Sequence, residues 1–201
     1  MDLEKHVWSL VMDIIEKARK ADKKSIRNGG CVAPSIIAFG YCPKCDEFTI
    51  CKVSVVSDME VIRGLFPIFV ASAFSKTEKC WKCGGNALPI GYAYSSEAWN
   101  LDVEGMDKEE INLYRSAFGT IAAHPKKREV YLTAVVTVIG KKMLMDEIVR
   151  EDGKVRFRRV KLPRKGDFIG RFVLPLPRIN LNEAIKKLTL NPAPSDASIN
   201  V

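Results

Sequence analysis

Two short cysteine pairs organise this chain: residues 42–45 read Cys-Pro-Lys-Cys, and residues 80–83 read Cys-Trp-Lys-Cys. A gap of two residues allows both sulfur atoms of a tight turn to face one tetrahedral metal ion. Four thiolates select zinc or iron, and we expect a structural Zn²⁺ ion. Because four protein ligands leave no open coordination position, this zinc would take no part in catalysis. The expected ligands are Cys42, Cys45, Cys80 and Cys83.

The length and composition favour a single globular domain. At 201 residues, the chain is long enough to bury a sizeable core without help from a metal. Its content of hydrophobic residues, 47%, is ordinary for a globular protein, so we expect disorder only in the C-terminal tail. The sequence therefore predicts one α+β domain over residues 1–190 and a flexible tail over 191–201. The zinc would stabilise only the part of the domain around its ligands.

The cysteine usage and the first residues predict a cytoplasmic location. The chain starts Met-Asp-Leu-Glu-Lys, without the basic region and apolar run of a signal peptide, and no stretch reaches the roughly 18 apolar residues of a membrane span. A reducing compartment favours thiolate–metal bonds over disulfides, which would leave Cys31 and Cys51 as free thiols. The absence of Gln, together with many Lys, Glu and Arg residues, is typical of hyperthermophile proteins.

Hydrophobic periodicity predicts helices and strands in an α+β arrangement. Apolar residues at helical spacing indicate an amphipathic helix over residues 3–18, and Asn180 caps a short helix that ends near residue 190. Another helix should run from 57 to 75, with a kink or a break at Pro67, and a fourth covers 108–118. The expected strands cover residues 36–39, 48–56, 90–99, 130–139, 143–150 and 154–162.

These strands are expected to form a mostly antiparallel sheet. Strand 130–139 is apolar on both faces and should therefore lie centrally. Asp152-Gly153 is a strong hairpin signal. In the third strand, simple alternation places Ile90, Tyr92 and Tyr94 on one face.

The last strand contains a break in its apolar alternation. Phe157 and Val160 differ in parity, so a regular strand would send them to opposite faces. A β-bulge near Arg158-Arg159 would return both side chains to the core side. We therefore predict a bulge at this position.

The two cysteine turns resemble the knuckles of zinc-ribbon and rubredoxin-like modules. The resemblance rests on Cys42-Pro43-Lys44-Cys45 and Cys80-Trp81-Lys82-Cys83-Gly84 and covers an element at residues 40–86. It implies a bound metal but no particular function, since such modules serve transcription factors, ribosomal proteins and enzymes. Most such sites join two hairpins, whereas here the second turn would follow a helix. The wider order of elements, with Ser96-Glu97-Ala98-Trp99, Pro125 and Arg128-Glu129, looks like a layout in small proteins of microbes and their mobile elements.

Few side chains indicate catalysis. No Gly-rich phosphate loop, His-Glu-x-x-His motif or Gly-x-Ser-x-Gly motif occurs. An enzyme would have to use Glu97, which lies near Asp102 and Glu104, and His124. We expect instead that the acids form a charge cluster at a strand end and that His124 is a loop residue. His6 is expected at the surface or at the rim of the first helix rather than as a metal ligand.

The basic residues favour an acidic partner. The net charge is +8, and the segment 141–165 holds ten basic and four acidic residues. Around Phe157 the cations would form a positive stripe suited to nucleic acid, although a solvated face or a protected edge strand explains them equally well. The expected stripe consists of Arg156, Arg158, Arg159, Lys161, Arg164 and Lys165.

Together these patterns predict a non-enzymatic, zinc-stabilised binding protein with nucleic acid as its first partner. The alternative is a protein-interaction module that docks another chain through its zinc end. An enzyme that uses Glu97 and His124 is a third hypothesis. A continuous basic stripe would favour the first hypothesis over the second, and a concave pocket joining Glu97 to His124 would favour the third.

Overall fold

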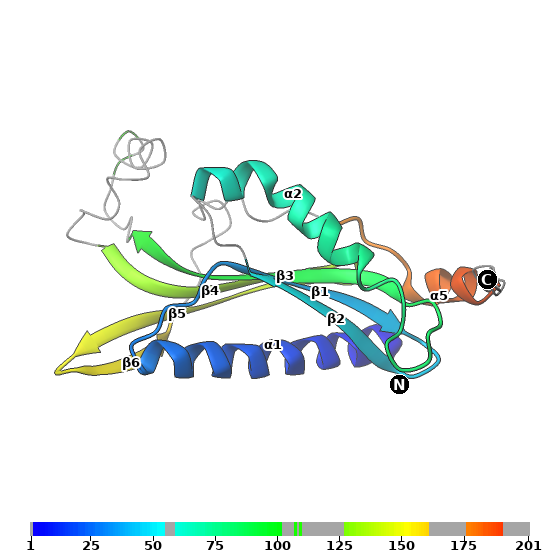
Figure 1. The fold of residues 1–201 in the computed structure, drawn as a ribbon, viewed down its shortest axis with the longest axis horizontal. Helices are drawn as coiled ribbons and strands as arrows, with labels where there is room; N and C mark the ends of the chain where they lie inside the picture. The colour runs from blue at the N-terminus through cyan, green and yellow to red at the C-terminus, as the bar shows by residue number, and fades with distance from the viewer. Residues whose placement is uncertain are drawn as a thin grey trace, which may run out of the picture.

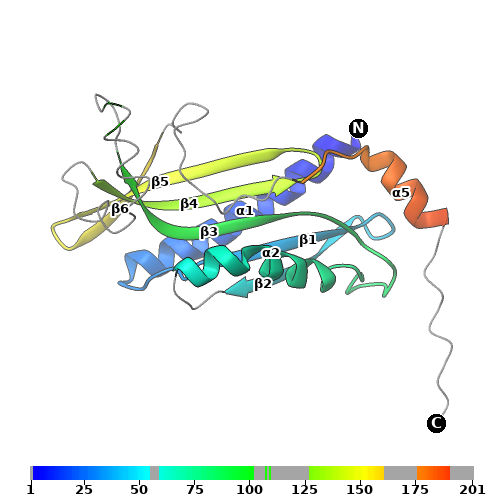
Figure 2. The same ribbon diagram turned by 90° about the horizontal axis from the view of Figure 1, so that it is seen from above.

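A curled, six-stranded antiparallel sheet with helices on both faces forms the protein (Figures 1 and 2). The computed structural model describes residues 2–54, 59–101, 107, 109, 127–160 and 176–190. The strand order is β2-β1-β3-β4-β5-β6, and every neighbouring pair is antiparallel. This arrangement confirms the predicted α+β class and the central place of strand 130–139. The elements are α1 (Leu3–Arg27), β1 (Ser35–Cys42), β2 (Glu47–Ser54), α2 (Met59–Ser75), β3 (Leu88–Leu101), β4 (Lys127–Thr137), β5 (Lys141–Glu151), β6 (Lys154–Arg159) and α5 (Leu181–Leu190).

Helix α1 is much longer than the predicted helix over residues 3–18. It begins after Asp2, whose carboxylate accepts the Glu4 N–H at 3.1 Å, and it ends before Gly29, which has a φ of +81°. The prediction stopped early because the next inward-facing position is Arg19, a charged side chain that is only 1% exposed. Sequence periodicity treats a buried arginine as the end of an apolar stripe.

One face of the sheet packs against α1, which runs along most of the sheet, while the tip of the β5–β6 hairpin projects beyond the end of the helix (Figure 1). Val7, Val11 and Ile15 of α1 are buried against a cluster that includes Phe39 of β1 and Val135 of β4. These apolar positions recur at helical spacing, so one stripe of α1 supplies the main core of the protein.

The opposite face packs against α2 over strands β1 and β3. Phe66 meets the rings of Tyr92 and Tyr94 edge to face, with centroids 6.0 Å and 5.5 Å away. Pro67 lies within one continuous helix rather than dividing it. Although α2 is the most apolar helix, no helix in the described part of the chain is long and apolar enough to cross a membrane.

Strand β3 contains a bulge that the sequence did not reveal. Phe39 pairs with Gly91, but the next residue of β1 pairs with Pro89, so Ile90 is an extra residue. The bulge turns Ile90 into the α1 cluster while Tyr92 faces α2. The prediction that Ile90 and Tyr92 share a face was therefore wrong, because a bulge shifts side-chain parity by one residue.

The hairpin of β5 and β6 forms at Asp152-Gly153 as predicted. Both residues have positive φ, 50° and 70°, as a two-residue turn of this kind requires. The predicted bulge near residues 158–159 is absent, because pairing runs in regular register from Glu151–Lys154 to Asp146–Arg159. Phe157 instead packs on the α1 side and Val160 joins a separate cluster with Val130 and Met145. Apolar clusters on both faces of the sheet remove the need for a bulge.

Helix α5 closes the α1 side of the sheet. Its predicted cap is confirmed, since the Asn180 side chain accepts the backbone N–H groups of Asn182 and Glu183 at 3.1 Å and 3.3 Å. Leu181 is fully buried in the α1 cluster. The predicted tail over 191–201 and nearly all of the predicted helix over 108–118 lie outside the described residues.

Candidate metal centre

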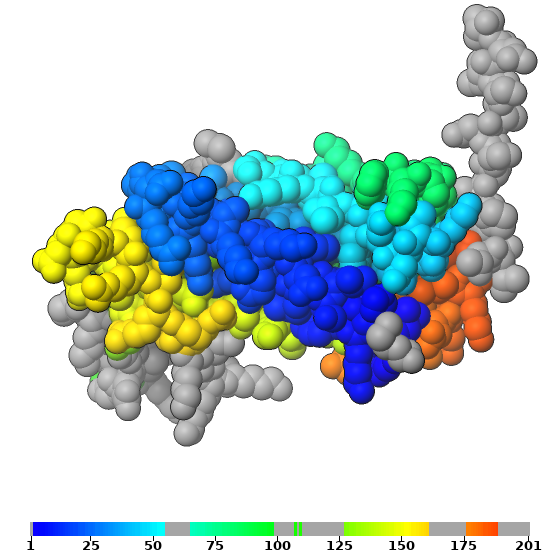
Figure 3. All heavy atoms as spheres, turned by 90° about the horizontal axis from the view of Figure 1, so that it is seen from below, coloured from blue at the N-terminus to red at the C-terminus, as the bar shows by residue number. Residues whose placement is uncertain are grey.

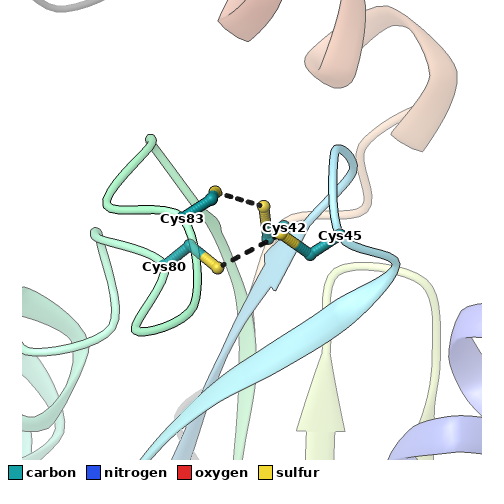
Figure 4. A group of neighbouring side chains, drawn as sticks. All are labelled: Cys42, Cys45, Cys80 and Cys83. Carbon is teal, nitrogen blue, oxygen red and sulfur yellow. Dashed lines mark hydrogen bonds between the residues drawn. The ribbon is translucent and has the colours of Figure 1, made fainter.

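The topology of the sheet brings the two cysteine turns together. Strand β1 ends at Cys42, and β3 runs antiparallel beside it, with Leu88 opposite Tyr41. The residues that lead into β3 therefore lie next to the turn that leaves β1. Figure 4 shows the four cysteine side chains converging from these two turns.

The spacing of the four sulfur atoms fits a tetrahedral metal ion. All four Sγ atoms lie within 4.8 Å of one another, with Cys42 Sγ 3.7 Å from Cys83 Sγ and Cys45 Sγ 3.9 Å from Cys80 Sγ. Sulfur atoms around Zn²⁺, with Zn–S bonds of about 2.3 Å, would be about 3.8 Å apart. The cluster is thus compatible with a metal ion such as zinc.

Each turn has the backbone shape that two nearby ligands need. Asp46, directly after the first pair, has a φ of 53°, and Gly84, directly after the second, has a φ of 65°. The Gly84 N–H donates to the Cys80 carbonyl at 2.8 Å, and the Cys80 N–H donates to the Gly85 carbonyl at 2.7 Å. A β-bridge between Lys79 and Asn86 closes the second turn. The second turn does follow a helix, as predicted, but its own bridge makes it a small hairpin.

The thiols of the cluster differ in acidity. Hydrogen bonding from Cys83, together with burial, raises the pKa of Cys45 to about 12. Burial alone would raise the pKa of the Cys80 thiol, but the backbone N–H groups of Cys83 and Lys82 lower it to about 7. A divalent cation binds the thiolate form and releases the protons.

The second turn is fixed to strand β2 by several hydrogen bonds. The Trp81 N–H donates to Thr49 Oγ1 at 3.2 Å, and Thr49 Oγ1 donates to the Lys79 carbonyl at 2.9 Å. The indole Nε1–H of Trp81 donates to the Phe48 carbonyl at 3.2 Å. Lys82 forms an ion pair with Glu47 at 2.6 Å. The metal turn is consequently held by the sheet as well as by its thiols.

Helix α1 reaches the first turn through His6. The ring Nε2 of His6 lies 2.9 Å from a carboxylate oxygen of Asp46, and the Tyr41 hydroxyl donates to the other oxygen at 2.7 Å. His6 thus lies at the rim of the helix as predicted, and it has a partner that the sequence did not indicate. These contacts connect the start of α1 to the metal end of the sheet.

The other two cysteines stand apart from the cluster. Cys31 is exposed after α1, and Cys51 is partly buried in β2, where it packs against the cluster beneath α2. Within the part of the chain that the structure describes, Cys42, Cys45, Cys80 and Cys83 form the only group of three or more metal-ligating side chains. The predicted ligand set is therefore brought together in full.

Glu97, which an enzyme would have to use together with His124, holds a neighbouring segment of the backbone in place. Its carboxylate accepts the backbone N–H of Val32, which fixes the segment between α1 and β1. It also lies 3.9 Å from the guanidinium of Arg150. His124, Asp102 and Glu104 lie outside the described residues.

The predicted basic stripe is divided between two faces of β6. Arg156 and Arg158 project from the face opposite α1, whereas Arg159 projects toward α1. Arg158 donates to Glu147 at 2.5 Å, and Arg159 Nε lies 3.1 Å from Asp146. Arg156 has no ion-pair partner among the described residues. The remaining residues of the predicted stripe, Lys161, Arg164 and Lys165, lie outside the described part of the chain.

A polar network that the sequence did not reveal lies beneath α1. Arg19 donates to Asp146 at 2.5 Å and also to the hydroxyl of Thr133. Lys23 and Arg159 bind the same carboxylate at 2.5 Å and 3.1 Å. The signal in the sequence was the charged residue at an inward position of a helix, which requires a buried partner of opposite charge.

The outer face of α1 carries four cations in line. Lys17, Lys20, Lys24 and Arg27 are separated by three, four and three residues, which places them on one side of the helix. We call these four residues the α1 ridge. All four are exposed, and none has an ion-pair partner among the described residues. Figure 3 shows this face, with α1 crossing it beside the hairpin of β5 and β6.

The α1 ridge extends to strand β6 through one aromatic ring. The cationic groups of Lys23 and Arg27 lie 5.2 Å and 5.1 Å from the ring centre of Phe157. Phe157 was predicted to lie within a positive stripe, and it does lie among cations. Those closest to it come from α1.

Comparisons with known proteins do not extend this description. No protein-family model, curated protein or solved structure matches the chain. The fold and the site define an α+β protein with a four-cysteine cluster compatible with a metal ion.

Proposed function

We propose that this protein is a non-enzymatic binding protein for nucleic acid, with a structural metal ion at one end of its sheet. Cys42, Cys45, Cys80 and Cys83 would hold the ion and saturate its coordination, so that it supplies stability rather than chemistry. The nucleic acid would bind along the α1 ridge. The observation that carries the proposal is the alignment of four exposed cations without acidic partners on one face of α1.

The α1 ridge has the length and charge expected for contact with a phosphate backbone. From Lys17 to Arg27 the helix rises ten residues, or about 15 Å at 1.5 Å per residue. Duplex DNA carries one charge per roughly 1.7 Å of axis. Several phosphates would therefore lie within reach of the four side chains.

The position of α1 on the sheet argues for backbone contacts rather than for reading of base sequence. A helix that reads bases enters the major groove, which is about 12 Å wide. Helix α1 instead lies against the sheet along its length (Figure 1), so the strands would prevent deep entry. Contacts limited to phosphates carry no sequence information. We therefore expect binding that depends on salt and hardly on sequence.

A salt titration of binding tests this proposal. Each phosphate neutralised on a DNA duplex contributes about −0.9 to the slope of log K against log salt. The variant with Lys17, Lys20, Lys24 and Arg27 all changed to Ala should flatten the slope by about 3 to 4 and weaken all sequences alike. Alanine favours the helix, so folding should be retained, as circular dichroism would verify.

Two matched variants act as controls. Changing Lys76, Lys141, Lys142 and Lys187 to Ala removes the same charge from exposed positions outside α1 and β6, and it should change the slope by less than about 1. Arg156→Ala with Arg158→Ala tests the stripe expected from the sequence, and its effect should also be small because Arg158 is bound to Glu147. If all three variants lose affinity equally, the ridge is only part of a diffuse charge. If the unmodified protein does not bind, the nucleic-acid proposal is wrong.

The proposed role of the metal makes a separate prediction. Cd²⁺ accepts the same four thiolate ligands as Zn²⁺, so exchange of the metal should leave nucleic-acid affinity unchanged within about twofold. A large change in binding on exchange would contradict a purely structural role.

One observation favours the alternative of a protein partner at the metal end. Trp81 is 71% exposed, the highest value among the large apolar side chains of the described residues. Exposed aromatic residues are enriched where proteins dock.

A further inference from the structure

Trp81 is an exposed aromatic ring held in a fixed position. It lies between two of the clustered cysteines, Cys80 and Cys83, with a backbone hydrogen bond to Thr49. Its indole Nε1–H donates to the Phe48 carbonyl at 3.2 Å. The edge of the ring is thereby anchored to β2, and 71% of the side chain faces solvent. A ring anchored in this way loses little conformational freedom when a flat partner stacks on it.

Trp81 lies close in the chain to lysines and to carboxylates, and one of these lysines has no ion-pair partner. Both cysteine turns carry a lysine at the third position, Lys44 and Lys82. Lys44 is exposed and has no ion-pair partner in the described part of the chain, since the neighbouring carboxylates of Asp46 and Glu47 bind His6 and Lys82 respectively. An exposed aromatic ring together with an unpaired cation is a combination that proteins use to bind single-stranded nucleic acid.

We propose that Trp81 is a stacking platform for an unpaired base, and that Lys44, which has no ion-pair partner among the described residues, contacts a neighbouring phosphate. This inference rests on the proposed nucleic-acid function and adds to it a preference for single strands over duplexes. Bases in a duplex are already stacked on one another, so only an unpaired base offers its face to Trp81. The α1 ridge would contact the backbone of either form.

The exposed apolar surface around Trp81 is small, which favours a single base over a protein as the partner of this side chain. The nearest other exposed apolar side chain on β2 is Ile50, two residues beyond Phe48 and 46% exposed. Phe48 itself is buried. A specific protein interface covers about 800 Å² on each partner around an apolar core, which these two side chains do not supply. One aromatic ring is sufficient for one base, whose stacking contributes about 1–3 kcal/mol.

Binding of Trp81 variants to two probes tests the inference. The first probe is an oligothymidylate of roughly 12 nucleotides, within the site sizes of single-strand binders, and the second is a duplex of the same length. Trp81→Ala should weaken binding of the single strand by about 5- to 150-fold, the range equivalent to one stacked base. Duplex affinity should change by less than about twofold. Trp81→Phe should retain most of the single-strand affinity, because phenylalanine keeps an aromatic face.

Two controls separate stacking from damage to the turn. Metal content and melting temperature should be the same in Trp81→Ala as in the unmodified protein, and Ile50→Ala, which removes the other exposed apolar side chain of β2, should leave both affinities unchanged. Stacking of thymine should also quench a component of tryptophan fluorescence that is absent from Trp81→Phe.

The outcomes distinguish this inference from the proposed function. One outcome is that the ridge variant loses affinity for both probes while Trp81→Ala keeps full affinity for both. In that case the nucleic-acid function stands and the stacking site is refuted. An equal loss of single strand and duplex in Trp81→Ala also refutes it. If nucleic acid does not bind and a purified protein partner is lost only in Trp81→Ala, the surface is a protein-docking site and both proposals fail.

Discussion

Among single residues, Arg19 and Asp146 form the contact that we expect to matter most for stability. Both are almost fully buried, at 1% and 2% exposure. Asp146→Leu would leave Arg19 buried without its anion, and loss of one partner of a buried pair costs about 3–5 kcal/mol. Arg19→Met should cost less, because Lys23 and Arg159 still bind Asp146. Urea unfolding of both single variants and of the double variant measures these costs. The double variant should be more stable than Asp146→Leu alone, and a strictly additive result would contradict the coupling.

The same carboxylate makes stability depend on pH. Burial alone would raise the pKa of Asp146, but Lys23 and Arg19 lower it below its ordinary value, which is near 4. Because the folded state favours the ionised form, this stabilisation is fully present above about pH 4 and is lost as the pH falls below that value. The stability difference between the unmodified protein and Asp146→Asn should therefore narrow in acid. A difference that is constant down to about pH 2 would show that Asp146 does not titrate in this range.

Gly40 predicts a coupling between β1 and the metal turn. A Cβ atom at this position would lie 2.0 Å from the Thr77 carbonyl oxygen, so the backbone before Cys80 would have to move. Gly40→Ala should therefore destabilise the protein by about 1–3 kcal/mol or more and also weaken zinc binding, as measured by competition with a chelator. Gly140→Ala is the matched control, because its Cβ would meet Trp8 at an ordinary 3.5 Å. Loss of stability without loss of zinc affinity would contradict the coupling.

Single residues also show where sequence interpretation succeeds. The four ligands were predictable because metal coordination imposes a fixed spacing on nearby cysteines. The partners of Arg19 and Asp46 were not, since they come from strands and helices 127 and 40 residues away along the chain. The residues of the α1 ridge were visible in the sequence, and only the early end assigned to the helix concealed their common face.

Among the elements, the two cysteine turns should be the first to loosen when the metal is removed. Their sulfur atoms converge from separate turns, whereas the α1 cluster and strands β4 and β5 have their own apolar core. Chelation should therefore increase amide hydrogen exchange first at residues 42–49 and 79–87, and the rest of the sheet should stay protected. Global unfolding on chelation would show instead that the core depends on the metal.

Local sequence patterns predict some of the strands and turns but not the bulges. Long apolar strands such as β4 and the turn at Asp152-Gly153 were predictable, because periodicity and turn chemistry are local. The bulge at Ile90 was not, because it exists only relative to the register of β1. The absence of a bulge in β6 depends on the second apolar cluster, which includes Val160, and no local pattern reveals that both faces of a sheet are covered.

At the scale of the whole molecule, α1 joins the two ends of the sheet. Near its start, His6 contacts the first cysteine turn, and near its end Lys23 and Arg27 meet Phe157 of β6. A single helix therefore contacts both the metal end of the sheet and strand β6. Sequence analysis could predict a helix and a sheet, but the path of α1 along that sheet is set by polar contacts that only the assembled structure reveals.

This path has a consequence for the order of folding. The strand pairs β1–β2, β3–β4, β4–β5 and β5–β6 are between consecutive strands, whereas Arg19 meets partners 114 and 127 residues later in the chain. Helix α1 precedes every strand of the sheet in the chain, yet its contact between Arg19 and Asp146 can form only after β5 has been made. We expect contacts of α1 to be absent from the transition state for folding. Ile15→Ala, which should cost at least about 2 kcal/mol, would then accelerate unfolding about 30-fold and leave the folding rate unchanged. Val135→Ala in β4 should slow folding instead, and stopped-flow kinetics of the two variants would decide whether the helix that precedes the sheet in the chain packs onto it last.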